Sequence, residues 1–272
     1  MRTKSFFYGL SALLFLTTLV SFSVLKKAAP MIKEENVTYT ADGVTMKGYV
    51  AYDDNVKGTR PAILVVHEWW GLNDYTKMRA RKLAELGYIA MALDLFGNGK
   101  NAANPKEAME LTAPFYKDPQ LGKARIDAAL VKLKGFPQAD ANRIAAIGYC
   151  FGGAVVLNSA KLGENWEGAV SFHGGLAGVP ANKDLLKAKL LVCHGADDKF
   201  VTQNDVDAFK HQMDSIQADY SFKVYPNATH AFTNPGSTEV GKKFNIPIAY
   251  NAEADKNSWN DMKAFFNKLF KK

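Results

Sequence analysis

The residues best suited to chemistry lie in a glycine-rich turn, Gly148-Tyr149-Cys150-Phe151-Gly152-Gly153. An apolar run precedes this turn and a helical pattern follows it, which is the context of a nucleophile elbow. Cys150 would then lie at the N-terminal end of a helix, where the helix dipole favours a thiolate. The backbone N–H of Phe151 would point to the same place and could stabilise an oxyanion. The alternative is a tight turn that holds a structural, buried cysteine.

A thiol nucleophile needs a general base and an acid that orients this base. After an elbow of this kind, the acid and then the histidine follow in chain order. His230 lies just beyond the predicted strand 220–225 and fills the position of the base. The acid is expected after the preceding apolar run, where Asp197 and Asp198 are both available.

The remaining histidines have simpler interpretations. His211 falls within a helical pattern and is expected to face solvent. His173 and His194 follow apolar runs, so they could line a cleft, although hydrogen bonds to nearby groups are the more common role. No group of side chains has metal-ligand spacing, so we predict no metal.

The motif His67-Glu68-Trp69-Trp70-Gly71 directly follows the apolar run 62–66. A loop at this place supplies a second oxyanion donor, which we assign to the backbone N–H of Trp69. The Glu68 carboxylate could face the nucleophile, and its negative charge would then hold Cys150 as a thiol until substrate binds. The alternative is an ordinary surface glutamate.

Apolar runs and amphipathic helical patterns alternate from residue 36 onward, which predicts an α/β fold. The continuous apolar runs are typical of parallel strands that are covered on both faces. An antiparallel hairpin is expected at the start, because two alternating segments flank Asp42-Gly43. The polar stretch 98–120 contains three prolines and is interpreted as a cap with short helical pieces. The expected strands are 37–39, 44–51, 62–66, 88–93, 143–148, 169–172, 189–193 and 220–225, and the expected helices are 77–86, 121–133, 153–160, 206–213 and one near the C-terminus.

The composition predicts one catalytic domain, residues 31–272, because 272 residues with 47% hydrophobic content can bury a full core. The net charge is +7, but the lysines and arginines are scattered, which argues against nucleic-acid binding. Residues 1–30 are interpreted as a signal peptide or an uncleaved signal anchor, because Arg2 and Lys4 precede the apolar stretch 6–25. The protein is therefore expected to be exported, periplasmic or secreted, and to meet a membrane only if this segment is uncleaved. We expect a monomer.

Taken together, these motifs resemble the dienelactone hydrolase family over residues 62–270. The resemblance rests on His-Glu-Trp-Trp-Gly at 67, Asp-Leu-Phe-Gly at 94, Gly-Tyr-Cys-Phe-Gly-Gly at 148, Gly-Ala-Asp-Asp-Lys-Phe-Val at 195 and His-Ala-Phe-Thr-Asn-Pro at 230. It implies the α/β-hydrolase fold, with a mostly parallel central sheet, helices on both faces and an antiparallel N-terminal hairpin. It also implies a triad of Cys150, His230 and Asp198, with Asp198 chosen by its Gly-x-x-Asp-x-x-Val spacing.

The same resemblance implies that Glu68 contacts the resting nucleophile and that no cofactor is used. The expected activity is hydrolysis of a small-molecule ester or lactone through an acyl-enzyme on Cys150. The family binds the carboxylate of dienelactone with arginines, one of them four residues after the triad histidine. Asn234 occupies that position here, and the stretch 97–118 contains lysines but no arginine. These departures argue against dienelactone itself, since lysine is a poorer bidentate partner for a carboxylate.

Two alternatives remain open from the sequence. The first is a non-catalytic exported binding protein on a hydrolase scaffold, which would have a cleft but no reactive thiol. The second is a disulfide between Cys150 and Cys193, because each cysteine follows or ends a predicted strand. Such a bond would remove the nucleophile.

Overall fold

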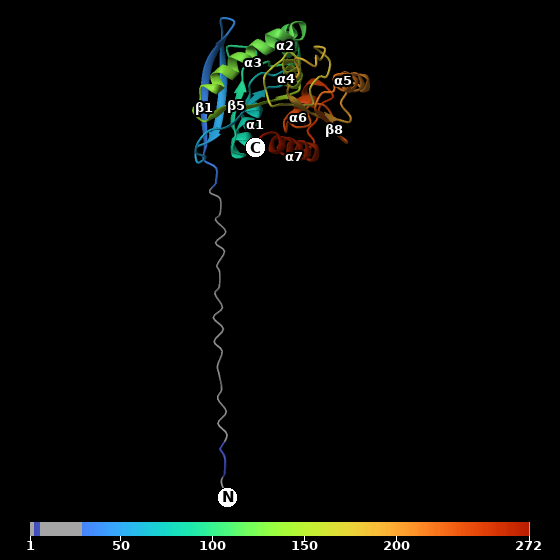
Figure 1. Cartoon of the computed structure of the whole chain (residues 1–272). Coiled ribbons are helices and arrows are strands. Elements are labelled where there is room, and N and C mark those ends of the chain that lie inside the picture. Colours follow the sequence, from blue (N-terminus) through green and yellow to red (C-terminus); the bar gives the residue numbers. More distant parts are fainter. Residues whose placement is uncertain (1–2, 6–28, 272) are drawn as a thin grey trace.

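The chain enters its central sheet through an antiparallel hairpin of β1 (Ile32–Ala41) and β2 (Val44–Asp53) (Figure 1). Asp42 and Gly43 connect the two strands with φ values of 48° and 73°. Two successive positive φ values are what a tight two-residue hairpin turn requires. The computed structural model describes residues 3–5 and 29–271, and in this part the predicted hairpin is confirmed, with longer strands than the sequence indicated.

The hairpin forms one edge of an eight-stranded sheet with the order β1-β2-β4-β3-β5-β6-β7-β8. β2 pairs antiparallel with β4, and every later pairing is parallel. The parallel strands end at one edge of the sheet, where the chemistry of such folds lies. The parallel part comprises β3 (Arg60–Val66), β4 (Ile89–Leu93), β5 (Ala139–Tyr149), β6 (Gly168–Phe172), β7 (Lys189–Gly195) and β8 (Tyr220–Tyr225).

Helices cover both faces of the sheet, which therefore has two apolar cores. In β3, Leu64 and Val66 belong to the core under α3, α4 and α5, whereas Ile63 and Val65 belong to the core under α1 and α7. This alternation explains why the strand is a continuous apolar run. The covering helices are α1 (Asp74–Glu85), α3 (Pro119–Lys134), α4 (Phe151–Lys161), α5 (Gln203–Ser215) and α7 (Ala252–Leu269). The predicted α/β-hydrolase architecture is confirmed.

Two further helices, α2 (Pro105–Lys117) and α6 (Ser237–Phe244), contribute side chains to the cavity at the carboxyl edge of the sheet. The short helical pieces predicted for 98–120 are instead one 13-residue helix, α2, followed at once by α3. The prediction was wrong because Pro105 and Pro119 occupy first helical positions, where the missing N–H costs nothing. α6 was not predicted, since it has only eight residues.

The predicted signal peptide or anchor, with its apolar stretch 6–25, falls almost entirely outside the described residues. Within the described ranges, no helix combines the length and the apolar character that a bilayer crossing requires. Export of the protein therefore stays a prediction.

Candidate active site

Cys150 lies in a strained turn between β5 and α4, with φ 54° and ψ −119°. A non-glycine residue adopts such a conformation only where its surroundings enforce it, and such strain concentrates at functional sites. The neighbouring glycines make the turn possible. A Cβ atom on Gly148 would lie 2.1 Å from the carbonyl oxygen of Gly152, and one on Gly152 would lie 2.5 Å from the carbonyl oxygen of Val66. The sequence motif therefore has the geometry of a nucleophile elbow.

Both cysteines are free, so the structure contradicts the alternative of a disulfide between them. Cys193 is buried in the core under α1 and α7, where its sulfur lies 3.5 Å from the Tyr225 hydroxyl oxygen. Burial raises the pKa of the Cys193 thiol to about 12. Cys150, in contrast, is partly exposed and lines a cavity.

His230 follows β8 and forms a buried pair with Asp198, which follows β7. Its Nδ1 lies 2.8 Å from Oδ2 of Asp198. The other carboxylate oxygen of Asp198 accepts hydrogen bonds from the backbone N–H groups of Phe200 and Val201, at 2.8 and 3.2 Å. Asp197 is exposed, so of the two candidate acids it is Asp198 that contacts the histidine. A proton held on Nδ1 leaves Nε2 available for chemistry.

The electrostatic surroundings of His230 favour its protonated form. Burial would lower the pKa of its imidazole, but the charge of Cys150, the hydrogen bond with Asp198 and the contact with Cys150 together raise it to about 10. The charge of Cys150 is the largest of these raising effects. The His230 imidazole can therefore carry a positive charge beside the Cys150 sulfur, and a neighbouring imidazolium is one of the groups that make a cysteine nucleophilic.

Glu68 is buried at the end of β3, with 2% of its surface exposed, so it is not the surface glutamate of the alternative interpretation. Nδ2 of Asn234 donates a hydrogen bond to its Oε2 at 2.7 Å. Burial raises the pKa of Glu68 to about 7, although the Asn234 hydrogen bond and the charges of His230 and Arg79 oppose this rise. Glu68 therefore changes its charge near neutral pH, in the same cavity as Cys150.

His67 has a structural role beside this glutamate. Its Nε2 accepts a hydrogen bond from the backbone N–H of Leu95 at 3.2 Å, so its Nδ1 carries the proton and bonds the Glu68 carbonyl oxygen at 2.5 Å. Burial lowers the pKa of His67 to about 4, so the ring stays neutral. The backbone from which Glu68 and Trp69 extend is thereby fixed.

The two predicted oxyanion donors belong to residues that line the same cavity as Cys150. Phe151 is the first residue of α4, and the first N–H groups of a helix have no intrahelical acceptor. Trp69 follows Glu68 in the turn after β3, and its ring contacts Trp70 with centroids 5.0 Å apart. Both residues therefore lie at the cavity, and the role of their N–H groups as oxyanion donors stays a prediction.

The cavity has a volume of about 340 Å³ and is largely apolar. Met109, Thr112 and Tyr116 of α2 form one wall, and Ser237 and Val240 of α6 contribute to another. Among the described residues that line it, there is no lysine or arginine. The lysines of 97–118 that might replace a family arginine are therefore not part of the cavity wall. In the described ranges, no three histidine, cysteine, aspartate or glutamate side chains gather as a metal site would require.

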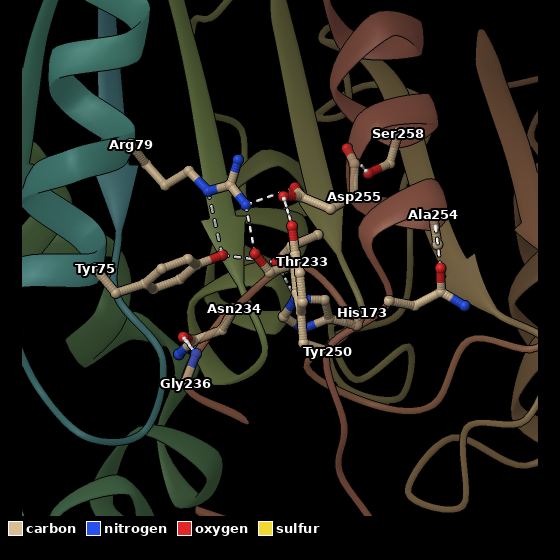
Figure 2. Close-up of polar contacts among 11 residues, drawn as sticks. Tyr75, Arg79, His173, Thr233, Asn234, Gly236, Tyr250, Ala254, Asp255 and Ser258 are labelled. Carbon is tan, nitrogen blue, oxygen red and sulfur yellow. Dashed lines mark hydrogen bonds and ion pairs between the residues drawn. The ribbon is translucent and has the colours of Figure 1, made fainter. Parts of the chain in front are cut away.

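Sequence reasoning singled out His173 but missed Arg79, Thr233 and Asp255, which lie beside this site (Figure 2). His173 was expected to make hydrogen bonds nearby, and its Nδ1 accepts one from the backbone N–H of Cys150 itself, at 3.1 Å. Its Nε2 lies 2.7 Å from Oγ1 of Thr233, in the loop that carries His230. The signal that indicated His173 is its position after β6, the strand next to β5. His211 is exposed, as predicted, and His194 packs against Phe222.

Comparison with known proteins decides the family. The sequence model of the dienelactone hydrolase family matches residues 46–270. The chain belongs to this family. As a dienelactone hydrolase family member, it is an enzyme that hydrolyses small esters or lactones, and the resemblance inferred from its motifs is confirmed.

Relatives of this dienelactone hydrolase family member span nearly its whole catalytic part. A protein of Aquifex aeolicus, provisionally named a carboxymethylenebutenolidase, is 29% identical over 75% of this chain and 89% of its own length. The protein usf of Aquifex pyrophilus is 27% identical over 85% of this chain and 96% of its own. Among solved structures, the dienelactone hydrolase-like promiscuous phosphotriesterase P91 from metagenomic libraries is 34% identical, with a TM-score of 0.83, over 88% of this chain and 99% of its own.

Proposed function

We propose that this hydrolase cleaves neutral, apolar esters or lactones through a covalent acyl-enzyme on Cys150. The observation that carries the proposal is the buried 2.8 Å pair of His230 and Asp198, which lies at the cavity where the elbow exposes Cys150. A nucleophile, a base and an orienting acid at one cavity are the parts that acyl transfer needs.

The reaction follows from these positions. The Cys150 thiolate attacks the carbonyl carbon, and the N–H groups of Phe151 and Trp69 stabilise the oxyanion that forms. Nε2 of the His230 imidazolium then gives its proton to the leaving oxygen, so that the C–O bond breaks and a thioester remains on Cys150. A water molecule attacks this thioester while His230 accepts its proton. The carboxylic acid leaves and the thiolate is restored, with Asp198 holding one tautomer of the base throughout.

Glu68 modulates the nucleophile in this proposal. It shares the cavity with Cys150, and Asn234 holds its carboxyl group in place. When Glu68 is ionised, its negative charge disfavours a thiolate nearby and keeps the resting enzyme in its thiol form. Because the pKa of Glu68 is raised to about 7, the proportion of restrained enzyme changes around neutral pH.

The substrate class follows from the charges of the cavity wall. A carboxylate on the substrate would find Glu68 and no lysine or arginine among the described lining residues, so anionic lactones are disfavoured. Apolar groups have favourable contacts instead. Met109, Tyr116 and Phe200 line the cavity, and each exposes about half or more of its surface, between 49% and 60%. Neutral substrates with apolar or aromatic groups fit this surface best.

A second substrate class has a specific observation in its favour. The solved relative at 34% identity is described as a promiscuous phosphotriesterase. A phosphotriester is neutral, as the cavity favours, and its phosphorus can be attacked by the same thiolate. The aryl group would then leave as an aryloxide, and water would hydrolyse the phosphorus–sulfur bond of the resulting phosphorylated Cys150. We place this activity second, because the family and its named relatives indicate carbonyl substrates.

Turnover of p-nitrophenyl acetate, p-nitrophenyl butyrate, a neutral γ-lactone and diethyl p-nitrophenyl phosphate tests the proposal. We expect Cys150→Ala to reduce kcat/KM for each accepted substrate by roughly a thousandfold or more, since the nucleophile is lost. Cys193→Ala is the matched control, because that cysteine lies in the core, where its sulfur contacts Tyr225. Equal rates in wild type and Cys150→Ala would contradict the mechanism. Absence of Cys150 labelling by iodoacetamide would favour the non-catalytic binding protein.

A further inference from the structure

A continuous network of buried polar groups lies beside the active site, and Figure 2 shows its part from His173 through Thr233 to Arg79 and Asp255. It begins at the backbone N–H of Cys150, passes through His173 and Thr233, and ends at Arg79 of α1 and Asp255 of α7. The mechanism proposed above uses none of these four side chains. Their role therefore needs a separate explanation.

His173 contacts the nucleophile turn directly. The backbone N–H of Cys150 is shared between the carbonyl oxygen of Phe172, at 3.0 Å, and Nδ1 of His173, at 3.1 Å. Because Nδ1 accepts this bond, the proton of the neutral ring lies on Nε2, which donates to Oγ1 of Thr233 at 2.7 Å. His173 is 1% exposed and has a positive φ of 41°. Burial, together with the charges of His230 and Arg79, holds its pKa well below the usual range, so this neutral tautomer persists.

Thr233 fixes the loop of the general base, since it lies three residues after His230. Its hydroxyl is bonded to the Tyr75 hydroxyl at 2.6 Å in addition to His173. Its carbonyl oxygen accepts a hydrogen bond from the Arg79 guanidinium. Both the side chain and the backbone of Thr233 are therefore held by α1, on which Tyr75 and Arg79 lie.

Arg79 anchors the network at its far end. It is 1% exposed, pairs with Asp255 at 2.6 Å and packs near the rings of Tyr75, Tyr149 and Trp259, with centroid distances of 5.2 to 5.4 Å. Burying such an ion pair costs desolvation energy, and apolar residues of similar volume often give equal or greater stability. A gain in stability therefore explains the buried Arg79–Asp255 pair poorly. The fixed direction of its hydrogen bonds explains it better.

We propose that His173 and Thr233 are positioning residues that set the geometry between the Cys150 thiol and the His230 imidazole. Arg79 and Asp255 hold Thr233 against α1 and α7, and His173 transmits this position to the strained backbone of Cys150. The inference rests on the proposed function, because it takes Cys150 and His230 as the reacting pair. The two loops follow different strands of the sheet, and this network links them through side chains.

The test is Thr233→Val, which keeps the shape of the side chain and removes the hydroxyl that His173 and Tyr75 contact. We expect kcat for p-nitrophenyl acetate to fall roughly tenfold to a hundredfold with KM within about threefold, since small misplacements of reacting groups have such effects. We also expect slower alkylation of Cys150 by iodoacetamide and a higher pH midpoint of that reaction. Thr233→Ser should restore both. Tyr75→Phe, which removes the other contact of the same hydroxyl, should change both readouts in the same direction by a smaller factor.

Ser258→Ala is the matched control, because it removes a buried hydroxyl that donates only within α7, to the Asp255 carbonyl oxygen at 3.1 Å. If Thr233→Val and Tyr75→Phe match this control in kcat and in the alkylation profile, the network is merely structural and the inference is overturned. Alkylation needs no substrate, so the inference is tested even if the wild-type enzyme hydrolyses none of the esters. Failure of the wild-type enzyme to hydrolyse any of these esters would contradict the proposed function alone.

Discussion

Replacing Glu68 with glutamine is expected to stabilise the protein in mild alkali and to change its stability little in acid. Glutamine keeps the size of the side chain and an oxygen that can accept the hydrogen bond from Asn234, but it carries no charge. Glu68 is 2% exposed, so water does little to reduce the cost of its ionisation. The substitution therefore isolates the free energy of burying this carboxylate.

The magnitude follows from the pKa of Glu68, which burial raises from 4.5 to about 7. A raised carboxyl pKa means that the folded protein favours the protonated form. The stabilising contribution of Glu68 is thus fully present below pH 4.5 and is lost as pH rises through about 7. The difference between these two pKa values corresponds to about 3 kcal/mol of unfolding free energy above pH 8, because one pKa unit equals about 1.4 kcal/mol.

Urea unfolding followed by circular dichroism measures this difference at about pH 4 and about pH 8.5. Glu68→Gln should exceed the wild type by about 3 kcal/mol in free energy of unfolding at the higher pH, and should nearly equal it at the lower pH. Glu110→Gln is the control, because the Glu110 side chain on α2 is exposed and lies outside the cavity lining. The same stability difference at both pH values, or a loss of stability at high pH, would refute the reasoning.

The other predictions concern the pKa of His230 and the Phe200 side chain that lines the cavity. The pKa of His230, followed by NMR of its ring protons, should be lower in Cys150→Ala than in the wild type, because the charge of Cys150 is the largest effect that raises it. Equal values would mean that the two side chains do not interact. Phe200→Ala should raise KM for aryl esters about fivefold and leave ethyl esters unchanged, since the ring lies 4.9 Å from that of His230, beside the leaving oxygen. An equal effect on both ester types would contradict this placement of the leaving group.

Much of the fold could be predicted from local patterns. The parallel strands are continuous apolar runs because helices cover both faces, and residues such as Ile63 and Leu64 pack into opposite cores. Asp42-Gly43 indicated the hairpin because two consecutive positive φ values restrict the residues that a turn can use. The prolines of 98–120 were less informative, because proline both ends helices and begins them.

Chain order indicated Cys150 and His230, and the spacing implied by the family resemblance chose Asp198, whereas the residues that support them could not be placed from the sequence. Cys150, Asp198 and His230 each follow a strand, so a parallel sheet brings them to one edge, whatever the detail of the packing. Arg79 and Thr233 lie 154 residues apart and meet only through the tertiary fold. Neither residue type, spacing nor periodicity indicates such a contact. The sequence likewise contained no sign that Asn234 bonds Glu68 rather than a substrate.

The positions of the charged groups explain how an apolar cavity can support ionic chemistry. Glu68, His230 and Asp198 are all buried, and each has a hydrogen-bond partner from another part of the chain. Arg79 balances part of this negative charge without entering the cavity lining, because Asp255 and Thr233 hold it beside α7. In the proposed mechanism the oxyanion forms beside the backbone N–H groups of Phe151 and Trp69, and in apolar surroundings fixed dipoles act more strongly than they do in water. A neutral substrate enters this environment at little electrostatic cost, and the negative charge of the thiolate moves to the carbonyl oxygen as the sulfur attacks.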